Sequence, residues 1–172
     1  MRQVANPNPS PNNETMKRQL TAAVLGLLLG SAAITACKSL GTPEDQSEAT
    51  TLWDEMSGYQ SWGGFDGHVG IMKGKSPHGK YVHTYVNEIG MADQAQPAYG
   101  TIIVKENFSR DDRDTLQGIT VMQRIEGYDA ENNDWFWARY TPKGELTHAG
   151  QVAFCSDCHF DAGADDFVFL ND

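Results

Sequence analysis

A Cys-x-x-Cys-His motif stands near the carboxyl end of this 172-residue chain, at Cys155, Cys158 and His159. Two thiols three residues apart can form thioether bonds with both vinyl groups of one haem, and the adjacent imidazole can then bind the iron from the same side. The sequence therefore predicts one covalently attached haem c, with Cys155 and Cys158 as thioether donors and His159 as the proximal iron ligand. Attachment of this kind takes place after export from the cytoplasm.

Three other uses of the cysteine pair stay open. A thioredoxin-like redox motif needs a βαβ context near the start of its fold, whereas this pair lies near the chain end. A zinc site needs four ligands, and no second C-x-x-C or H-x-x-x-H is present to complete it. A simple disulfide is the third alternative. The directly following His159 favours haem over all three.

The first 36 residues are predicted to be a targeting region. Residues 1–15 are rich in Pro and Asn, and they form either a disordered extension or, as we favour, a stretch upstream of a start at Met16. Lys17 and Arg18 then precede an apolar stretch, 20–30, that has signal-peptide length and is shorter than the ~20 residues of a spanning helix.

This region ends in residues 34–37, Ile-Thr-Ala-Cys, which look like a bacterial lipoprotein box. In such a box the thiol of Cys37 is lipidated; the alternative is an ordinary cleaved signal peptide that leaves Cys37 as a free thiol. Lys38 is not the aspartate that usually retains lipoproteins at the inner membrane. We therefore expect a lipoprotein on the periplasmic side of the outer membrane, with a lipid-anchored tether over 37–47 and one haem domain over 48–172.

The chain is acidic, with 23 Asp and Glu against 13 Lys and Arg and a net charge of −10. This balance argues against a nucleic-acid partner, because binding to a phosphate backbone depends on clustered basic charge. Four aspartates crowd the carboxyl end around the motif: Asp157, Asp161, Asp165 and Asp166. They form either a solvated acidic tail or a surface that steers a basic redox partner, such as a cytochrome.

The apolar pattern predicts a mainly β (α+β) domain in which an antiparallel sheet of about five strands and a few short helices pack around the haem. A short amphipathic helix is expected at 48–59 and a helical turn at 89–96. Strands are expected at 80–88, 101–106, 118–126, 135–140 and 151–154. Hairpin-like spacing of the last four segments favours a meander. The charged segment 109–117 is expected to be a solvated loop.

The second axial position of the iron separates electron carriers, which fill it with Met or His, from ligand-binding haems, which leave it open. The candidate ligands are Met56, Met72, Met91, Met122, His68, His78, His83 and His148. None stands in a recognisable ligand context, and such side chains are more often core or surface residues. His83, midway along an expected strand, is the one best placed to point into a pocket.

Four stretches together resemble the cytochrome P-460 family, which includes the β-sheet cytochromes c′ (cytochrome c′-beta). They are residues 81–87 (YVHTYVN), 100–106 (GTIIVKE), 134–137 (DWFW) and the motif at 155–159, and the likeness covers about 53–169. The resemblance implies an antiparallel sheet packed on one haem, commonly in a homodimer. It also implies a five-coordinate iron that faces small nitrogen compounds.

Lys105 stands where the resemblance implies a covalent bond from a lysine to a haem meso carbon. Such a bond would distort the macrocycle and shift its electronics. Strand alternation groups Lys105 with Thr101 and Ile103, but both faces of the segment are partly apolar, so alternation does not fix which face meets the haem. An ordinary exposed strand lysine is the alternative.

Two functions follow from this resemblance, and a third competes with them. Cytochrome P-460 members oxidise hydroxylamine with help from a pocket carboxylate, for which Glu106 and Glu126 are candidates. The β-sheet cytochromes c′ lack the cross-link and bind nitric oxide in an apolar distal pocket, for which Phe65, Phe136 and Trp137 could supply the cap. A plain electron carrier with a filled sixth iron position is the third. The first reading, oxidation of hydroxylamine or nitric oxide, is the one we favour.

Overall fold

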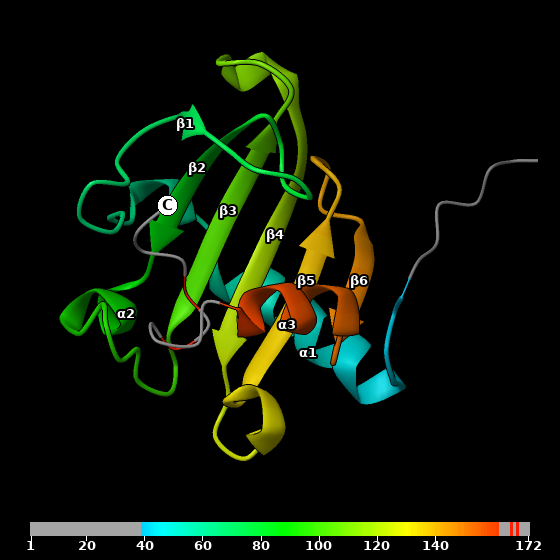
Figure 1. Cartoon of the computed structure of the whole chain (residues 1–172). Helices are drawn as coiled ribbons and strands as arrows, with labels where there is room; N and C mark the ends of the chain where they lie inside the picture. Colours follow the sequence, from blue (N-terminus) through cyan, green and yellow to red (C-terminus); the bar gives the residue numbers. More distant parts are fainter. Residues whose placement is uncertain (1–38, 162–165, 167, 169–172) are drawn as a thin grey trace, which may run out of the picture. The chain divides into compact units, whose positions relative to one another are not determined.

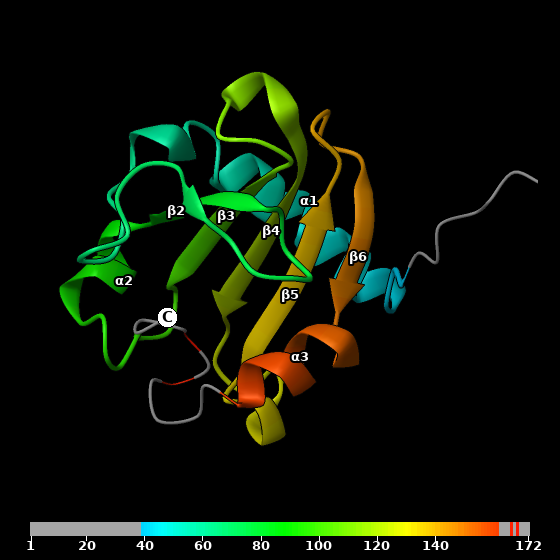
Figure 2. The same cartoon turned by 45° about the horizontal axis from the view of Figure 1, so that its top comes forward.

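Six antiparallel strands follow one another across a single sheet in the order of the sequence (Figures 1 and 2). The computed structural model describes residues 39–161, 166 and 168. The strands are β1 (Met72–Lys73), β2 (Tyr81–Val86), β3 (Ile102–Phe108), β4 (Leu116–Arg124), β5 (Trp135–Tyr140) and β6 (Leu146–Gly150). This meander confirms the predicted mainly β (α+β) fold. It has one strand more than expected, because β1 and β6 were not predicted and the strand predicted at 151–154 is absent.

Three α-helices complete the fold: α1 (Pro43–Glu55), α2 (Glu88–Ala92) and α3 (Ala153–Phe160). Short 3-10 turns lie at Tyr59–Ser61, Arg113–Thr115 and Ala130–Asn132. α1 covers one face of the sheet and α3 crosses the other, so the sheet lies between them (Figures 1 and 2). We call these the α1 face and the α3 face.

Strand alternation sorts the core into two clusters, one on each face of the sheet. On the α1 face, Leu52 of α1 packs in a cluster with Val121 of β4 and Ala138 of β5. On the α3 face, Met122 and Trp137 pack in a cluster with residues that flank α3. Since Val121 is paired with Ala138 and Met122 with Trp137, the register of β4 and β5 fixes which side chains meet each helix.

The first helix begins five residues before the expected start at residue 48. The Thr42 hydroxyl accepts a hydrogen bond from the Asp45 backbone N–H at 3.1 Å, and the Asp45 carboxylate accepts one from the Thr42 backbone N–H at 2.8 Å. This reciprocal capping, with Pro43 in the first turn, starts the helix at Pro43. Residues 43–47, predicted as part of the tether, are therefore helical.

The chain just before α1 pairs with β6, the edge strand at the other side of the sheet from β1. Ser39 forms a parallel bridge with His148 of β6, and the Ser39 carbonyl accepts a hydrogen bond from the Ala149 N–H at 2.9 Å. The predicted signal segment 1–36 and Cys37 lie outside the described residues. Within the described part of the chain, no helix is long and apolar enough to span a bilayer.

The strand expected at 151–154 is wrong. The last strand ends at Gly150, which has a φ of +93°, and a Cβ atom there would lie 2.6 Å from the Asp45 carboxyl carbon. Glycine therefore lets the chain leave the sheet beside the start of α1. Val152 then packs in the α3-face cluster, and the segment that follows is helical. The other expected helix, 89–96, is the shorter α2, which Asn87 caps.

Candidate functional site

α3 carries all three residues of the Cys-x-x-Cys-His motif. Residues three and four positions apart share one side of a helix, so Cys155, Cys158 and His159 lie together. Cys155 is half-buried, Cys158 is exposed and both thiols are free. His159, in contrast, is buried, with 8% of its surface exposed. The helix thus exposes the Cys158 thiol, packs the half-buried Cys155 against the α3-face cluster and buries the His159 imidazole.

Two aromatic side chains meet the His159 ring on the α3 face. The Trp137 ring of β5 lies with its centroid 4.8 Å from that of His159. The His78 ring, from the loop between β1 and β2, lies with its centroid 6.1 Å away and its plane at 88° to that of His159. The site is therefore built from α3, the middle of the sheet and the loop before β2.

His78 is neutral over the physiological range. Burial of the ring, with a smaller contribution from electrostatic interaction with Lys105, His159 and Arg139, lowers its pKa to about 3. The hydrogen bond between His78 Nδ1 and Asn107 Oδ1, 3.2 Å long, opposes this shift only in part. A neutral imidazole is the form that binds metals.

Lys105 lies on the α3 face. Its register partners on β2 and β4 are Thr84 and Thr120, and alternation from Ile103 of the α3-face cluster gives Lys105 the same side. Its charge acts on His78, which contacts His159. The structure thus answers the question that strand alternation alone left open: Lys105 and the Cys-x-x-Cys-His helix share one face.

The residues on this face have the chemistry that a c-type haem requires. Besides the thiols and the imidazole, the face carries Arg139, whose charge partly offsets the burial that raises the pKa of Cys155 to about 11. The indole N–H of Trp137 is buried and has no hydrogen-bond partner among the described residues. A buried donor of this kind costs about 1–3 kcal/mol when it stays unpaired. A cation and an unpaired donor suit the carboxylates of a haem, so the residues fit this cofactor.

The structure separates the candidate sixth ligands by face. Met91 and Met122 pack in the α3-face cluster, and His148 faces the same way as its register partner Arg139. Met56 is buried in the α1-face cluster, Met72 is 37% exposed on the edge strand, and His68 contacts the Asp66 carbonyl in a loop. His78 alone of these eight is seen in ring contact with His159.

The expectation that His83 is best placed to point into the pocket is wrong. His83 is paired with Glu106 across β2 and β3, so its side chain lies on the α1 face. There its Nδ1 lies 2.8 Å from the Tyr85 hydroxyl and 2.9 Å from an Arg113 guanidinium nitrogen. Alternation along β2 directs this ring away from α3.

Glu106, a predicted pocket carboxylate, also lies on the α1 face. It is 4% exposed and accepts hydrogen bonds from the hydroxyls of Tyr59 at 2.8 Å and Tyr85 at 3.1 Å, and from Arg113 at 3.2 Å. Glu106 therefore cannot line a pocket on the α3 face without crossing the sheet. Arg113 belongs to the segment predicted as a solvated loop, and it reaches back to this buried acid. The other candidate, Glu126, is exposed in the turn after β4.

The three expected cap residues divide between the faces. Phe65 and Trp137 are buried in the α3-face cluster, as an apolar cap requires. Phe136 is buried in the α1-face cluster, so its predicted part in the cap is wrong. The reason is again alternation, because Phe136 and Trp137 are adjacent in β5.

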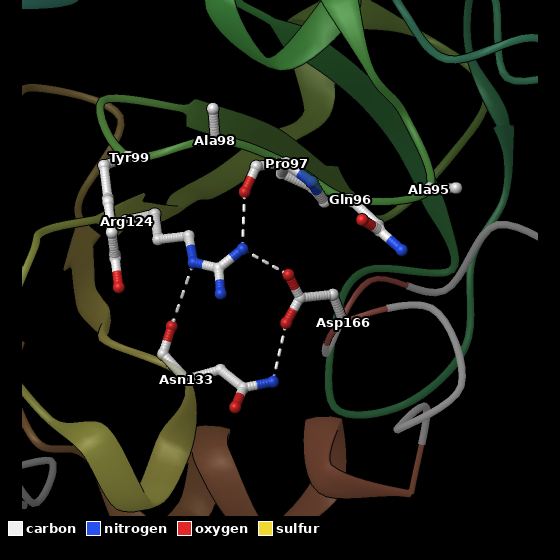
Figure 3. Close-up of a pocket in the computed structure, with 8 residues that line it drawn as sticks. All are labelled: Ala95, Gln96, Pro97, Ala98, Tyr99, Arg124, Asn133 and Asp166. Atoms are coloured by element: carbon white, nitrogen blue, oxygen red, sulfur yellow. Dashed lines mark hydrogen bonds and ion pairs between the residues drawn. The ribbon is translucent and has the colours of Figure 1, made fainter.

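A second arrangement, which the sequence did not indicate, surrounds Arg124 at the end of β4 (Figure 3). Its guanidinium pairs with the Asp166 carboxylate and donates to the Asn133 carbonyl at 3.1 Å. The Asn133 amide donates to Asp166 at 2.6 Å, and the Trp135 indole donates to the Asp166 carbonyl at 3.1 Å. Together with the segment 95–99, Arg124, Asn133 and Asp166 line a cavity of about 600 Å³.

This pairing corrects part of the acidic surface predicted at the carboxyl end. Asp166 is bound to Arg124 and is not a free surface charge. Asp157 and Asp161 are exposed on and just after α3. Asp165 lies outside the described residues.

Comparison with known proteins identifies the family. Among curated proteins, no sequence matches this chain. The profile of the family described as Cytochrome P460 matches residues 56–170, which is about two-thirds of the chain and takes in β1 to β6, Lys105 and the whole of the Cys-x-x-Cys-His helix. The fold, the face shared by Lys105 and α3, and this match together show that the chain belongs to the cytochrome P460 family, a family of haem cytochromes.

Proposed function

We propose that this protein is an exported mono-haem cytochrome c that carries out redox chemistry on hydroxylamine or nitric oxide. Cys155 and Cys158 would attach the haem and His159 would bind its iron. When bound, the haem supplies the iron that binds the nitrogen compound and takes up its electrons. The protein's own contribution is to attach, orient and enclose that group.

The placement of Lys105 supports this proposal best. β3 is an interior strand, paired with β2 on one side and β4 on the other, so Lys105 projects from a fixed position toward the face that carries α3. In cytochrome P-460 proteins a lysine in this sequence context is joined to the haem. A lysine on the α1 face would have had the whole sheet between it and the motif.

A binding protein for nitric oxide is the second candidate. The α3-face cluster is apolar and includes Phe65, Val86 and Ile103 beside Met122 and Trp137. Such a surface suits a small uncharged gas, which needs no charged partner. Glu106 lies on the α1 face and Glu126 is exposed in the turn after β4, so neither predicted carboxylate is packed against this cluster.

Location and partners belong to the same proposal. Lipidation of Cys37 would attach the domain to the periplasmic side of the outer membrane. The exposed carboxylates of Asp157 and Asp161 lie on and just after the helix that would hold the haem. They could steer a basic redox cytochrome to the haem edge, where electrons leave the protein.

The test is mass spectrometry of protein matured with its haem-ligation machinery, followed by a visible spectrum of the ferrous form. For the enzyme we expect a haem peptide that joins Lys105 with Cys155 and Cys158, and a strongly red-shifted Soret band. Lys105→Arg should keep the thioether bonds and lose both the cross-link and the red shift. Lys73→Arg, on the edge strand β1, should keep all three.

Two other results would change the assignment. Haem attached only through the thioethers, with a spectrum that responds to nitric oxide, would favour the binding protein. Colourless protein, with the two thiols free or joined to each other, would refute the proposed function altogether.

A further inference from the structure

We infer that a pocket on the α1 face binds a small organic cation, namely a primary ammonium group that carries a short apolar chain. The pocket lies between the end of α1, the 3-10 turn at Tyr59–Ser61 and the strands β3 and β4. Because the sheet separates this pocket from α3, it is distinct from the proposed haem site and would add a second function to the protein.

The size and the walls of the pocket suit a small molecule. Its volume is about 430 Å³, and small-molecule sites generally occupy about 300–1,000 Å³. Met56, Leu116 and Ile119 give it apolar walls, and Trp53 and Tyr59 give it aromatic ones. An apolar chain inside the pocket would therefore be sheltered from water.

A buried carboxylate with unused hydrogen-bonding capacity lies against this pocket. Glu106 lines the pocket and is 4% exposed. Its Oε2 accepts hydrogen bonds from Tyr85 and Arg113, whereas its Oε1 accepts one bond, from the Tyr59 hydroxyl at 2.8 Å. Each carboxylate oxygen has two lone pairs, so Oε1 can accept a further donor. Of the three partners only Tyr59 lines the pocket, which places Oε1 on the pocket side.

The charges around the pocket favour a cation. A second carboxylate, that of the exposed Asp54, lies at its rim, and none of the described residues that line it is Lys, Arg or His. Arg113 approaches Glu106 through the other oxygen, and its side chain is 56% exposed, so water screens much of its charge. The Tyr59 hydroxyl already donates its proton to Glu106. The ligand must therefore supply both the N–H donor and the positive charge.

The aromatic walls are held in place by their own packing. The Trp53 ring packs on Tyr140 with the centroids 4.7 Å apart, and the Tyr59 ring packs edge-on against Tyr85 at 5.2 Å. Gly144 has a φ of +84°, and a Cβ atom there would lie 2.6 Å from Trp53 Cζ2, so glycine leaves room for the indole. Tryptophan and tyrosine rings attract cations through their faces. The pocket is thus formed before a ligand arrives.

Other classes of ligand fit these groups less well. An anion would meet the carboxylates of Glu106 and Asp54. A neutral apolar molecule would leave the free lone pair of the buried Glu106 without a donor, which is costly. A bare metal ion would need more ligands, and the described residues contain no group of three or more His, Cys, Asp or Glu that could hold one.

The test is a nuclear magnetic resonance titration of the ferrous carbon monoxide form of the holoprotein with butylammonium. Carbon monoxide occupies the iron in this form, so the amine cannot bind there, and the Trp53 indole N–H reports on the pocket. We expect a saturable shift of that signal. Butylammonium should bind about tenfold or more tightly than the matched probes ammonium, butanol and butyrate, because only butylammonium offers both a charged donor and an apolar chain.

Substitutions at the two carboxylates separate this site from general apolar binding. Glu106→Gln should weaken butylammonium binding about tenfold or more, since it removes the charge that the ammonium group meets. Asp54→Asn covers the case in which Glu106→Gln fails to fold, and it should weaken binding about twofold, as expected for an exposed charge. Glu55→Gln is the matched control, because Glu55 is exposed beside Asp54 and does not line the pocket.

Two results would overturn the inference. One is butylammonium binding that neither Glu106→Gln nor Asp54→Asn changes relative to Glu55→Gln. The other is butanol, butyrate or ammonium alone binding as tightly as butylammonium. Colourless protein would refute the proposed function without affecting this inference, because the same titration of the haem-free protein would still decide it.

Discussion

Lys105 and Glu106 are neighbours in β3, yet they project from opposite faces of the sheet. Lys105 shares its face with α3 and the Cys-x-x-Cys-His motif, whereas Glu106 is buried on the α1 face beneath Tyr59, Tyr85 and Arg113. The residues proposed to serve the haem are thereby separated from a buried acid network by the sheet itself. Substitutions on the two faces should have separable effects.

Glu106→Gln should destabilise the fold and leave the haem spectrum unchanged. The substitution removes the charge that three donors share, and the amide group turns a donor toward at least one of them. Since hydrogen bonds to a charged group contribute about 1.5–3 kcal/mol, we expect the free energy of unfolding to fall by about 2 kcal/mol. Denaturation of the holoprotein checks this, with the exposed Glu126→Gln as control, which should change stability by less than about 0.5 kcal/mol.

Thr42→Ala should weaken the start of α1. Loss of an N-cap hydroxyl typically costs about 1 kcal/mol, and here the reciprocal bond with Asp45 is lost as well. Thr50→Ala is the matched control, because the Thr50 hydroxyl only bonds back to the Gln46 carbonyl within the helix. Thermal unfolding should show a lower midpoint for the first variant and no lower midpoint for the second.

Arg124→Gln should cost more than a surface substitution. Both partners of the Arg124–Asp166 pair are largely buried, with side chains 18% and 15% exposed. Removing one partner leaves the other charge uncompensated, which costs about 3 kcal/mol. Arg110→Gln, in the exposed loop after β3, is the control. Equal stability of the two variants in denaturant titrations would contradict this reading of the pair.

Stability should decline in acid partly because of His83. Burial and the neighbouring Arg113 charge lower the pKa of His83 below 6.5, and the Glu106 charge offsets this in part. The unfolded chain therefore binds a proton more readily than the native state does, so stability is complete above about pH 6.5 and is lost as the pH falls below it. Unfolding measured between pH 5 and 8 should show this slope, and His83→Asn should reduce it.

Local chemistry made much of this molecule predictable. β5 falls on the six residues expected for it because aromatic side chains dominate that segment, with turn residues on both sides. The Cys-x-x-Cys-His motif depends on residues within five positions of one another, so its chemistry could be inferred without the fold. β1 could not be predicted because a strand of two residues is too short to show the alternation of apolar and polar side chains.

What sequence alone could not supply was the assignment of faces. Alternation shows that Lys105 and Glu106 point in opposite directions, but only the packing of α1 and α3 shows which side meets the motif. For the same reason the side of His83 could not be predicted, because alternation groups it with Glu106 and only the packing shows that this pair lies on the α1 face. The Arg124–Asp166 pair joins positions 42 residues apart, and no local pattern connects them.

The hydrogen bond between the Ser39 carbonyl and the Ala149 N–H fixes the chain to β6 only two residues after Cys37. From Cys37 to Ser39 an extended chain spans only about 7 Å. If Cys37 carries an acyl group, the β6 edge would therefore lie close to the lipid headgroups. The distance between the domain and the membrane would then be short. In that arrangement the β6 edge would be closed to an electron donor or acceptor, and the β1 edge, on the far side of the sheet, would face away from the bilayer.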